Sequence, residues 1–272
     1  MSSQISSVTL PLWLDDYIFN RLGATYCCSR SNMSVIDWNN VDVLNYLGTY
    51  FPRSFVESYS IFTSFLKKHA VIYDCKKELS IFDFGCGTGG EIIGLLLALS
   101  EQCKSLKHVI IRAHDGNFHA LRLFESILHE SRSYIQIPQI ETRIFPLEIE
   151  DFYDLSILEE VLSCKFDIIL SFKAICEFVT KERFEQSNPY KHVADLFLQK
   201  LEDDGVMLLA DVTVYNDVSQ EWLPHMMDVG LQQVFCNVIA QNEGYNQSFR
   251  VFHSRKRMDV SKIAWRIINR SR

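Results

Sequence analysis

The sequence predicts an α/β fold with a doubly wound, mostly parallel sheet. From about residue 80 to residue 210, short apolar runs alternate with longer amphipathic segments, which is typical of parallel strands joined by helices. A glycine-rich turn follows the first of these runs and opens the first of these helices. Two further apolar runs after residue 230 are separated by a turn-rich tetrapeptide, which predicts an antiparallel hairpin and brings the sheet to seven strands.

The five expected parallel strands are apolar and partly β-branched or aromatic. They cover residues 80–84, 108–113, 142–147, 166–171 and 206–210. Apolar residues at helical spacing predict four helices between them, over residues 91–102, 118–130, 155–163 and 193–201. The final hairpin is expected to join strands 231–240 and 248–254 through the turn at 241–244.

Composition sets limits on the kind of protein. The chain has 272 residues, 47% of them apolar, enough for one large domain with a buried core. The net charge is −7, but residues 250–272 hold eight Lys or Arg against Asp259 alone, so the rest carries about −14. This acidic body argues against a broad nucleic-acid surface, while the basic C-terminus leaves a local one open. A solvated final strand and helix explain the same residues.

Other signals are absent from the sequence. The N-terminus lacks the basic and apolar regions of a signal peptide, and the longest apolar run, 92–99, is too short to cross a bilayer. The eight cysteines form no CxxC pair, and no His, Asp or Cys cluster has metal-ligand spacing. We therefore expect a cytoplasmic protein with no membrane partner, no metal and reduced thiols.

The strongest chemical signal is the turn Asp83-Phe84-Gly85-Cys86-Gly87-Thr88-Gly89. Glycines let the backbone turn tightly and let a ligand lie against the main chain, and the following helix offers free N–H donors. A bare GxGxG also marks dinucleotide sites and turns without a ligand. The carboxylate of Asp83 is poorly suited to a pyrophosphate and well suited to an ammonium group.

The tract FDFGCGTGG resembles motif I of the class I S-adenosylmethionine (SAM) dependent methyltransferases, and the order of strands and helices is similar over residues 78–255. The resemblance implies SAM lying across the carboxyl ends of the first strands of a seven-stranded sheet. It divides the chain into a mainly helical extension that can cap the cleft (1–79), a SAM-binding Rossmann-like domain (80–255) and a basic C-terminal tail (256–272).

The resemblance also assigns cofactor-binding residues by position. The acid ending the second strand, Asp115, should bind both ribose hydroxyls, although it could instead cap the helix that follows. After the third strand, Glu148 and Ile149 align with residues that contact adenine, in a register ambiguous by one or two positions. The expected set is Asp83, Gly85, Cys86, Gly87, Gly89, Asp115, Glu148, Ile149, Ser171 and Phe172.

The segment after the fourth strand faces the transferring methyl group in this family, which places Ser171, Phe172 and Lys173 at the reacting end. The Asn/Asp-Pro-Pro-aromatic motif of many nucleic-acid amino-methylating enzymes is absent here. If the acceptor must lose a proton, Glu177 is the first candidate base, with Tyr190 and Ser171 as further catalytic candidates. A solvated Glu177 and a packing role for Tyr190 are the ordinary alternatives.

The sequence thus predicts a SAM-dependent methyltransferase acting on a small-molecule acceptor. A SAM-using enzyme that releases methylthioadenosine is one alternative. Another is a ribosome- or RNA-associated methyltransferase-like factor, since SFKAICEF and the Tyr50, Pro52 and Arg53 positions are similar to ribosomal small-subunit assembly factors of this fold. A dehydrogenase is a third, because Gly85, Gly87 and Gly90 also satisfy GxGxxG.

Overall fold

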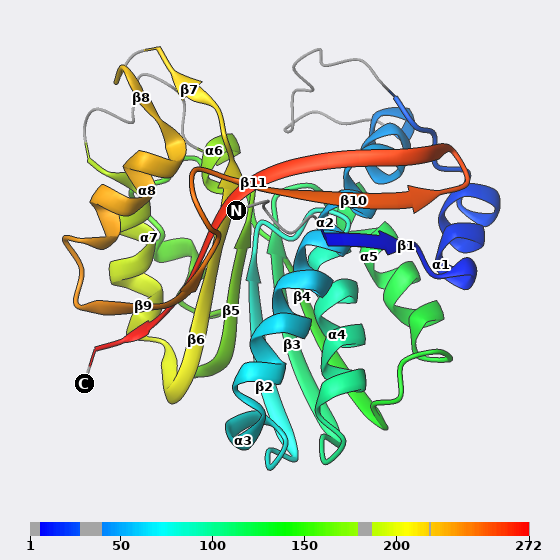
Figure 1. The fold of residues 1–272 in the computed structure, drawn as a ribbon, viewed down its shortest axis with the longest axis horizontal. Helices are drawn as coiled ribbons and strands as arrows, with labels where there is room; N and C mark the ends of the chain where they lie inside the picture. Colours follow the sequence, from blue (N-terminus) through cyan, green and yellow to red (C-terminus); the bar gives the residue numbers. More distant parts are fainter. Residues whose placement is uncertain (1–5, 28–39, 179–186, 218, 272) are drawn as a thin grey trace.

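One large twisted sheet organises the molecule. The computed structural model describes residues 6–27, 40–178, 187–217 and 219–271. Within these ranges a nine-stranded sheet has the order β1-β10-β11-β6-β5-β2-β3-β4, and β9 pairs with β11 as well (Figure 1). Helices cover both faces of the sheet.

The parallel half of the sheet confirms the doubly wound prediction. Numbered along the chain, its five strands lie in the order third, second, first, fourth, fifth, so the direction of winding reverses between the first and the fourth. Ligands of doubly wound sheets bind at the carboxyl ends of the strands beside this reversal. The strands are β2 (Glu78–Phe84), β3 (His108–Asp115), β4 (Gln139–Pro146), β5 (Phe166–Phe172) and β6 (Leu201–Val212).

The C-terminal strands depart from the prediction. The long strand β11 (Lys256–Arg270) is antiparallel to β6 on one edge and to both β9 (Cys236–Gln241) and β10 (Gln247–His253) on the other. Ile263 pairs with Val212 and with Gln247, which proves that β6 and β10 lie on opposite edges. The expected tail therefore forms a strand inside the sheet, and the hairpin consists of β10 and β11.

The predicted reversal at residues 241–244 was wrong because the chain does not turn back there. β9 and β10 run in the same direction along one edge of β11, with the turn residues bulging out between them. Asn242 replaces strand pairing at this bulge: its Oδ1 accepts from the Trp265 amide at 2.8 Å and from Arg266 Nη1 at 2.7 Å. The Asn242 side chain also donates to the Gly244 carbonyl at 2.9 Å.

The helices follow the predicted pattern except in one place. The expected helix over 155–163 is only the single 3-10 turn η2 (Ser156–Leu158), whose surrounding leucines are buried in loops. The apolar residues are spaced so that they can be buried in this loop, and the spacing does not indicate a helix. The other helices after β2 are α4 (Gly90–Gln102), α5 (Phe118–Ser131), α6 (Ile175–Phe178), α7 (Pro189–Leu198) and α8 (Leu223–Leu231), and a small hairpin consists of β7 (Tyr215–Asn216) and β8 (Glu221–Trp222).

The described parts of the N-terminal extension form helices and also supply an edge strand. β1 (Ser6–Thr9) pairs in parallel with β10, and it is followed by α1 (Leu12–Asp16) and the π-helix η1 (Tyr17–Arg21). The long helix α2 (Asn40–Lys68) and the short α3 (Ala70–Tyr73) then lead into β2. None of the described helices combines the length and apolar character needed to span a bilayer.

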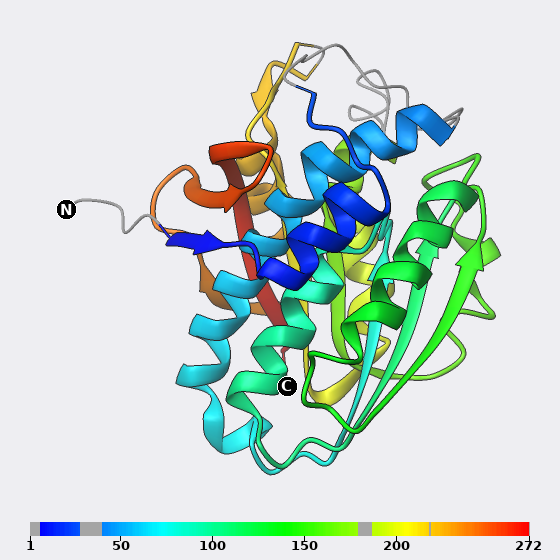
Figure 2. The ribbon, with the colours of Figure 1, turned by 90° about the vertical axis from the view of Figure 1, so that its right-hand side faces the viewer.

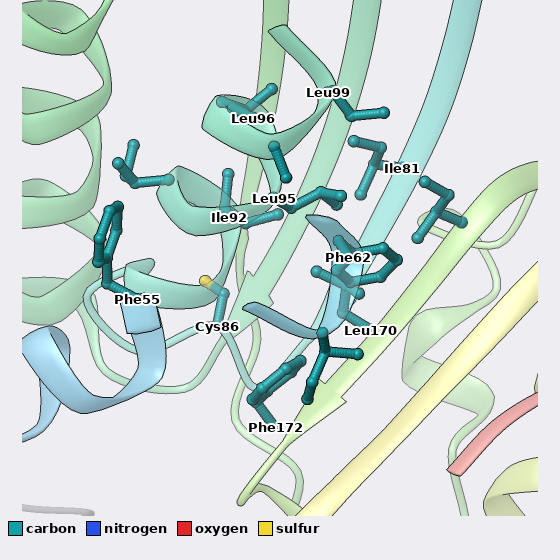
Figure 3. Close-up of a cluster of buried hydrophobic side chains, with 14 of the residues drawn as sticks. Phe55, Phe62, Ile81, Cys86, Ile92, Leu95, Leu96, Leu99, Leu170 and Phe172 are labelled. Atoms are coloured by element: carbon teal, nitrogen blue, oxygen red, sulfur yellow. The ribbon is translucent and has the colours of Figure 1, made fainter. Parts of the chain in front are cut away.

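Helix α2 packs directly on α4. A Cβ placed on Gly94 would lie 2.5 Å from the Phe55 carbonyl oxygen, so only glycine permits this approach of the two backbones. The Ser58 hydroxyl donates to the Glu91 carbonyl at 2.7 Å across the same interface. Phe55 and Phe62 of α2 join the leucines and isoleucines of α4 and β2 in one buried cluster (Figure 3). The extension is thus part of the main core.

Candidate functional site

The glycine turn lies at the winding reversal of the sheet, between β2 and α4. Gly85, Gly87 and Gly89 all have positive φ values, of 74°, 49° and 78°, which side chains with a Cβ rarely adopt. The amides of Gly85 and Cys86 both donate to the His114 carbonyl at 2.9 Å, tying the turn to β3. A Cβ on Gly87 would meet the Tyr46 hydroxyl at 3.2 Å. The turn is therefore held by hydrogen bonds to β3 and is covered by Tyr46 of α2.

Asp83 is the most unusual polar group of the site. Its side chain is fully buried at the end of β2, and within the described part of the chain neither of its oxygens accepts from an N–H or hydroxyl donor. Burial raises the pKa of Asp83 well above its ordinary value; the Glu91 carboxyl, by its charge and by a side-chain hydrogen bond, and the charge of Asp115 raise it further. Because buried carboxylates are normally hydrogen-bonded, these two oxygens indicate a place for a donor or a cation.

Glu91 adds a second acid at the same point. It is the second residue of α4 and only 4% exposed. Burial raises the pKa of Glu91 to about 8, although a backbone hydrogen bond and the charge of Lys173 act in the opposite direction. A helix N-terminus usually favours anions, but a phosphate bound here would oppose the ionisation of the two acids, whereas a cation would favour it. The site is suited to a cationic ligand group.

Asp115 lies at the end of β3, facing the glycine turn. Its Oδ2 accepts from the Gly87 amide and its Oδ1 from the Asn117 amide, both at 2.7 Å. The cap of α5 is Asn117, whose side chain accepts from the Ala120 amide at 2.9 Å. The helix-capping alternative for Asp115 is therefore wrong. Burial raises the pKa of Asp115, while these backbone hydrogen bonds lower it in part.

The loop after β4 borders the same region. Glu148 is exposed, and its Cα would lie 3.6 Å from a Cβ on Gly116, just beyond Asp115. Ile149 is half-buried against the buried apolar cluster that includes Phe152 and Leu155. His114, which the sequence reading missed, fixes this loop because its Nε2 donates to the Leu147 carbonyl at 2.8 Å. Burial lowers the pKa of His114 to about 4, so the ring is neutral at physiological pH.

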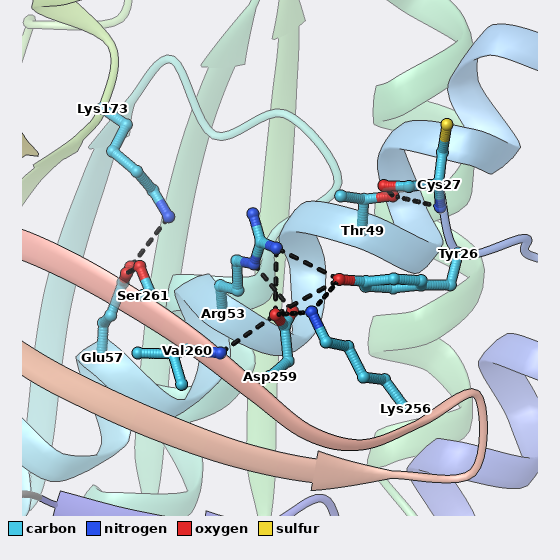
Figure 4. Close-up of polar contacts among 10 residues, drawn as sticks. All are labelled: Tyr26, Cys27, Thr49, Arg53, Glu57, Lys173, Lys256, Asp259, Val260 and Ser261. Carbon is cyan, nitrogen blue, oxygen red and sulfur yellow. Dashed lines mark hydrogen bonds and ion pairs between the residues drawn. The ribbon is translucent and has the colours of Figure 1, made fainter. Parts of the chain in front are cut away.

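Ser171 and Phe172 are buried at the end of β5, next to β2 and β6. Lys173 follows with a φ of 55°, and its amide donates to the Ala210 carbonyl at 2.7 Å. Its Nζ lies 2.8 Å from Oε2 of the fully buried Glu57 on α2. Ser261 of β11 donates to the other Glu57 oxygen (Figure 4). One carboxylate thus links the carboxyl end of β5 to α2 and β11.

The two remaining candidates, Glu177 and Tyr190, differ in solvent exposure. Glu177 is exposed on α6, and its pKa is raised to about 8 by partial desolvation and by the charges of Asp115 and Asp211. Tyr190 of α7 is fully buried and donates to Asp211 Oδ2 at 2.9 Å, while the same carboxylate oxygen accepts from the Cys176 amide at 3.2 Å. Tyr190 therefore positions the start of α6 through Asp211, whereas the Glu177 side chain is open to solvent.

Several site residues escaped the sequence reading. Tyr46, Glu57 and Glu91 surround the glycine turn from α2 and α4, and the burial of the glutamates is what reveals them. The only sequence signal was the aromatic richness of the extension and an acid in the first turn of the first helix. No group of three or more potential metal ligands occurs in the ranges that the structure describes.

The strand order, in which β11 runs antiparallel between β6 and β10, decides the fold type. The fold is Rossmann-like, as the resemblance of the sequence to the class I methyltransferases implied. No family model matches the chain, and none of the curated proteins matches it.

Two methyltransferases are among the similar solved structures. Precorrin-6Y C5,15-methyltransferase from Geobacter metallireducens is 13% identical, with a TM-score of 0.45, over 79% of this chain and 88% of that chain. An rRNA methyltransferase from Streptomyces viridochromogenes is 12% identical, with a TM-score of 0.41, over 76% of this chain and 83% of that chain. These likenesses are distant.

Proposed function

We propose that the protein is a SAM-dependent methyltransferase. The observation that carries the proposal is the buried Asp83 carboxyl group, which accepts from no N–H or hydroxyl donor in the described structure and lies beside a glycine turn next to a second buried acid, Glu91. SAM carries two positive groups, an ammonium and a sulfonium. A cation stabilises the ionised forms of Asp83 and Glu91 and pairs with them, whereas the anionic pyrophosphate of a dinucleotide would find no positive charge there and would oppose their ionisation. The two acids therefore favour SAM over NAD.

The residues of the site fit the parts of SAM. Asp83 and Glu91 would receive the ammonium, and each becomes ionised as it does so. Asp115 already orders the Gly87 amide and keeps further lone pairs for the ribose hydroxyls. The exposed loop at Glu148 and the half-buried Ile149 border the position expected for adenine.

Chemistry at this site requires little acid–base work from the protein. SAM supplies an electrophilic methyl group, whose bond to sulfur breaks with the electron pair staying on sulfur as the acceptor lone pair binds the carbon. Tyr46 above the turn and the buried Phe172 exclude water, and the ion pair with Glu57 holds Lys173 in place. Glu177, with a pKa of about 8, is suited to take a proton from the acceptor.

Calorimetry with SAM and with NADH tests the proposal, on the wild type and on Asp83→Asn. Removing the charge of Asp83 while keeping its shape should weaken SAM binding about 100-fold, as expected for a buried charged contact. Asp195→Asn, which changes an exposed acid of α7, is the matched control and should bind SAM normally. Binding of NADH without SAM would overturn the proposal.

A second readout separates methyl transfer from other uses of SAM. The nucleoside released during turnover with cell extract should be S-adenosylhomocysteine. Methylthioadenosine would instead show that another carbon on sulfur is transferred or cyclised, and the cofactor assignment would stand while the reaction changed.

A further inference from the structure

Lys173 brings a positive charge to the carboxyl end of the sheet, where the acids of the site lie. It follows directly after β5, the strand next to β2, and Leu170 of β5 pairs in register with Asp83. Its φ of 55° lies in the left-handed region, and the hydrogen bond from its amide to the Ala210 carbonyl, at 2.7 Å, holds it there. Strained backbone of this kind clusters at binding and active sites, because the surrounding structure must stabilise it.

Helix α2 fixes the Lys173 side chain near the start of α4. Lys173 Nζ donates to Oε2 of Glu57 at 2.8 Å, and Ser261 of β11 donates to the other oxygen of Glu57 (Figure 4). The next residue of α2, Ser58, donates to the Glu91 carbonyl at 2.7 Å, where α2 and α4 lie side by side (Figure 2). The pKa of Glu91 agrees with this position, because burial raises it and the positive charge of Lys173 acts against burial. Lys173 and Glu91 therefore belong to one cluster of charged groups.

This cluster contains hydrogen-bonding groups that the protein itself leaves unused. An ammonium group has three N–H donors, and within the ranges that the structure describes Lys173 Nζ donates to Glu57 alone. The Lys173 side chain is only 13% exposed, so little water is available to its other donors. The fully buried Asp83, which interacts with Glu91, accepts from no N–H or hydroxyl donor in the same ranges. Unused donors and unused acceptors thus occur together, which indicates a ligand group with both charges.

We propose that Lys173 binds the carboxylate of the α-amino acid group of SAM, while Asp83 and Glu91 bind its ammonium. This rests on the proposed methyltransferase function and adds to it the residue that recognises the other charge of the amino acid. An α-amino acid carries both charges on one carbon, so its site needs a cation close to acids. Glu57 is the positioning residue, because its ion pair holds Lys173 away from a salt bridge with Glu91 and leaves both groups for the ligand.

Recognition of both charges gives the site a specificity. Decarboxylated SAM keeps the ammonium and the sulfonium but has no carboxylate, so the free N–H groups of Lys173 would stay unpaired in a largely buried place. The site should therefore bind SAM and S-adenosylhomocysteine in preference to decarboxylated SAM. An enzyme that transfers the aminopropyl group of decarboxylated SAM would need the opposite preference.

Calorimetry with a pair of ligands tests the proposal without any turnover. SAM and decarboxylated SAM are titrated into the wild type, Lys173→Met and the control Lys191→Met, which removes a lysine that pairs with Asp195 on the surface of α7. Lys173→Met keeps the length of the side chain and removes its charge. It should weaken binding of SAM about 10-fold to 100-fold, and binding of decarboxylated SAM by less than about twofold. Lys191→Met should leave both affinities unchanged.

A second variant keeps the test independent of stability. Lys173→Met leaves Glu57 buried without its counter-charge, which lowers the free energy of unfolding. The double variant Lys173→Met with Glu57→Gln removes both charges and should show the same selective loss for SAM. The readout is the ratio of the two dissociation constants, because general damage to the site would weaken both ligands alike.

The outcomes separate the two proposals. If the wild type prefers SAM and both Lys173 variants lose this preference, both proposals stand. If SAM binds but the variants weaken both ligands equally or neither of them, the assignment of Lys173 fails and the proposed function survives. Tighter binding of decarboxylated SAM than of SAM by the wild type would also overturn the assignment. Failure of the wild type to bind SAM overturns the proposed function, and the assignment of Lys173 with it.

Discussion

Two neighbouring segments of the chain have opposite charge, and an ion pair joins them. Residues 213–249 hold four acids and no Lys or Arg; Asp217 and Glu243 are exposed, whereas Glu221 and Asp228 are partly buried. Residues 250–272 hold eight Lys or Arg. Four of these cations hydrogen-bond or pair with groups of the protein itself: Arg255, Lys256, Arg266 and Arg270. Much of the charge of the basic segment therefore serves the fold, and Arg266 uses an acid of the acidic segment, Asp228, to do so.

Two ion pairs show what the basic segment does. Arg266, buried in β11, makes a two-point contact with Asp228 of α8 at 2.8 and 2.9 Å. Asp259, buried at the other end of β11, accepts from Arg53 of α2 at 2.7 and 3.0 Å and pairs with Lys256 (Figure 4). The strand is thus attached to one helix on each side of the sheet. A basic composition here does not predict a nucleic-acid surface.

The largest effect is expected at the buried pair. Asp228→Ala should lower the free energy of unfolding by about 3 kcal/mol, because it leaves the Arg266 guanidinium buried without its counter-charge. Arg266→Met should cost clearly less, since Asp228 is partly exposed and can be solvated. Urea denaturation measures both. Equal losses of unfolding free energy in the two variants would contradict the expectation that an unpaired buried charge costs more than an unpaired, partly exposed one.

A smaller loss is expected where α2 meets α4. Gly94→Ala should lower the free energy of unfolding by about 2 kcal/mol, because the new methyl group would overlap the Phe55 carbonyl. Gly244→Ala in the acidic segment is the comparison. Nothing lies within 4 Å of its Cβ position, and only its positive φ of 66° opposes the change, which should cost about 1 kcal/mol. Thermal unfolding with calorimetric detection checks the order.

The stability of the protein and its affinity for SAM should both depend on pH through Glu91. The raised pKa of Glu91, about 8, means that the free folded protein holds a proton that the unfolded chain has lost. This group's contribution to stability is therefore largest at low pH and is lost as pH rises towards 8. The proposed SAM site uses the ionised form of Glu91, so on that proposal affinity should rise by up to about tenfold per pH unit up to pH 8. In Glu91→Gln the slope should flatten; an unchanged slope would exclude Glu91 as its source.

Asp259 should behave in the opposite way. Burial would raise its pKa, but hydrogen bonds and charge from Arg53 and Lys256 outweigh burial and lower it. The resulting stability is present above the ordinary pKa of an aspartate, near 4, and is lost as pH falls below it. Asp259→Asn should cost about 1 to 2 kcal/mol at pH 7 and much less at pH 3, by chemical denaturation at each pH.

The smallest effect is expected for an exposed pair of the same strand. Arg270→Ala breaks the contact with Asp203, in which both side chains are open to water, and should change the free energy of unfolding by less than about 0.5 kcal/mol. A loss as large as that of Asp228→Ala would mean that burial does not determine how much each ion pair contributes to the free energy of unfolding.

The sequence predicted what is local. The parallel strands, the glycine turn, Asp83 and Asp115 follow from short patterns that a strand, a turn and a helix impose on neighbouring residues. It could not show that Lys173 pairs with Glu57, 116 residues away, or that Tyr46 covers Gly87. The hairpin error has the same origin. Whether 241–244 reverses the chain or bulges depends on β11, which lies beyond the turn.

The position of β11 has a consequence for how the sheet is assembled. β11 lies between β6 and β10, and β10 in turn carries β1, the first described segment. Strands β2 to β6 can pair before β11 is in place, but β10 and β1 then have no strand that joins them to the sheet. Removing β11 would therefore detach β10 and β1 together, and their attachment depends on contacts between residues far apart in sequence.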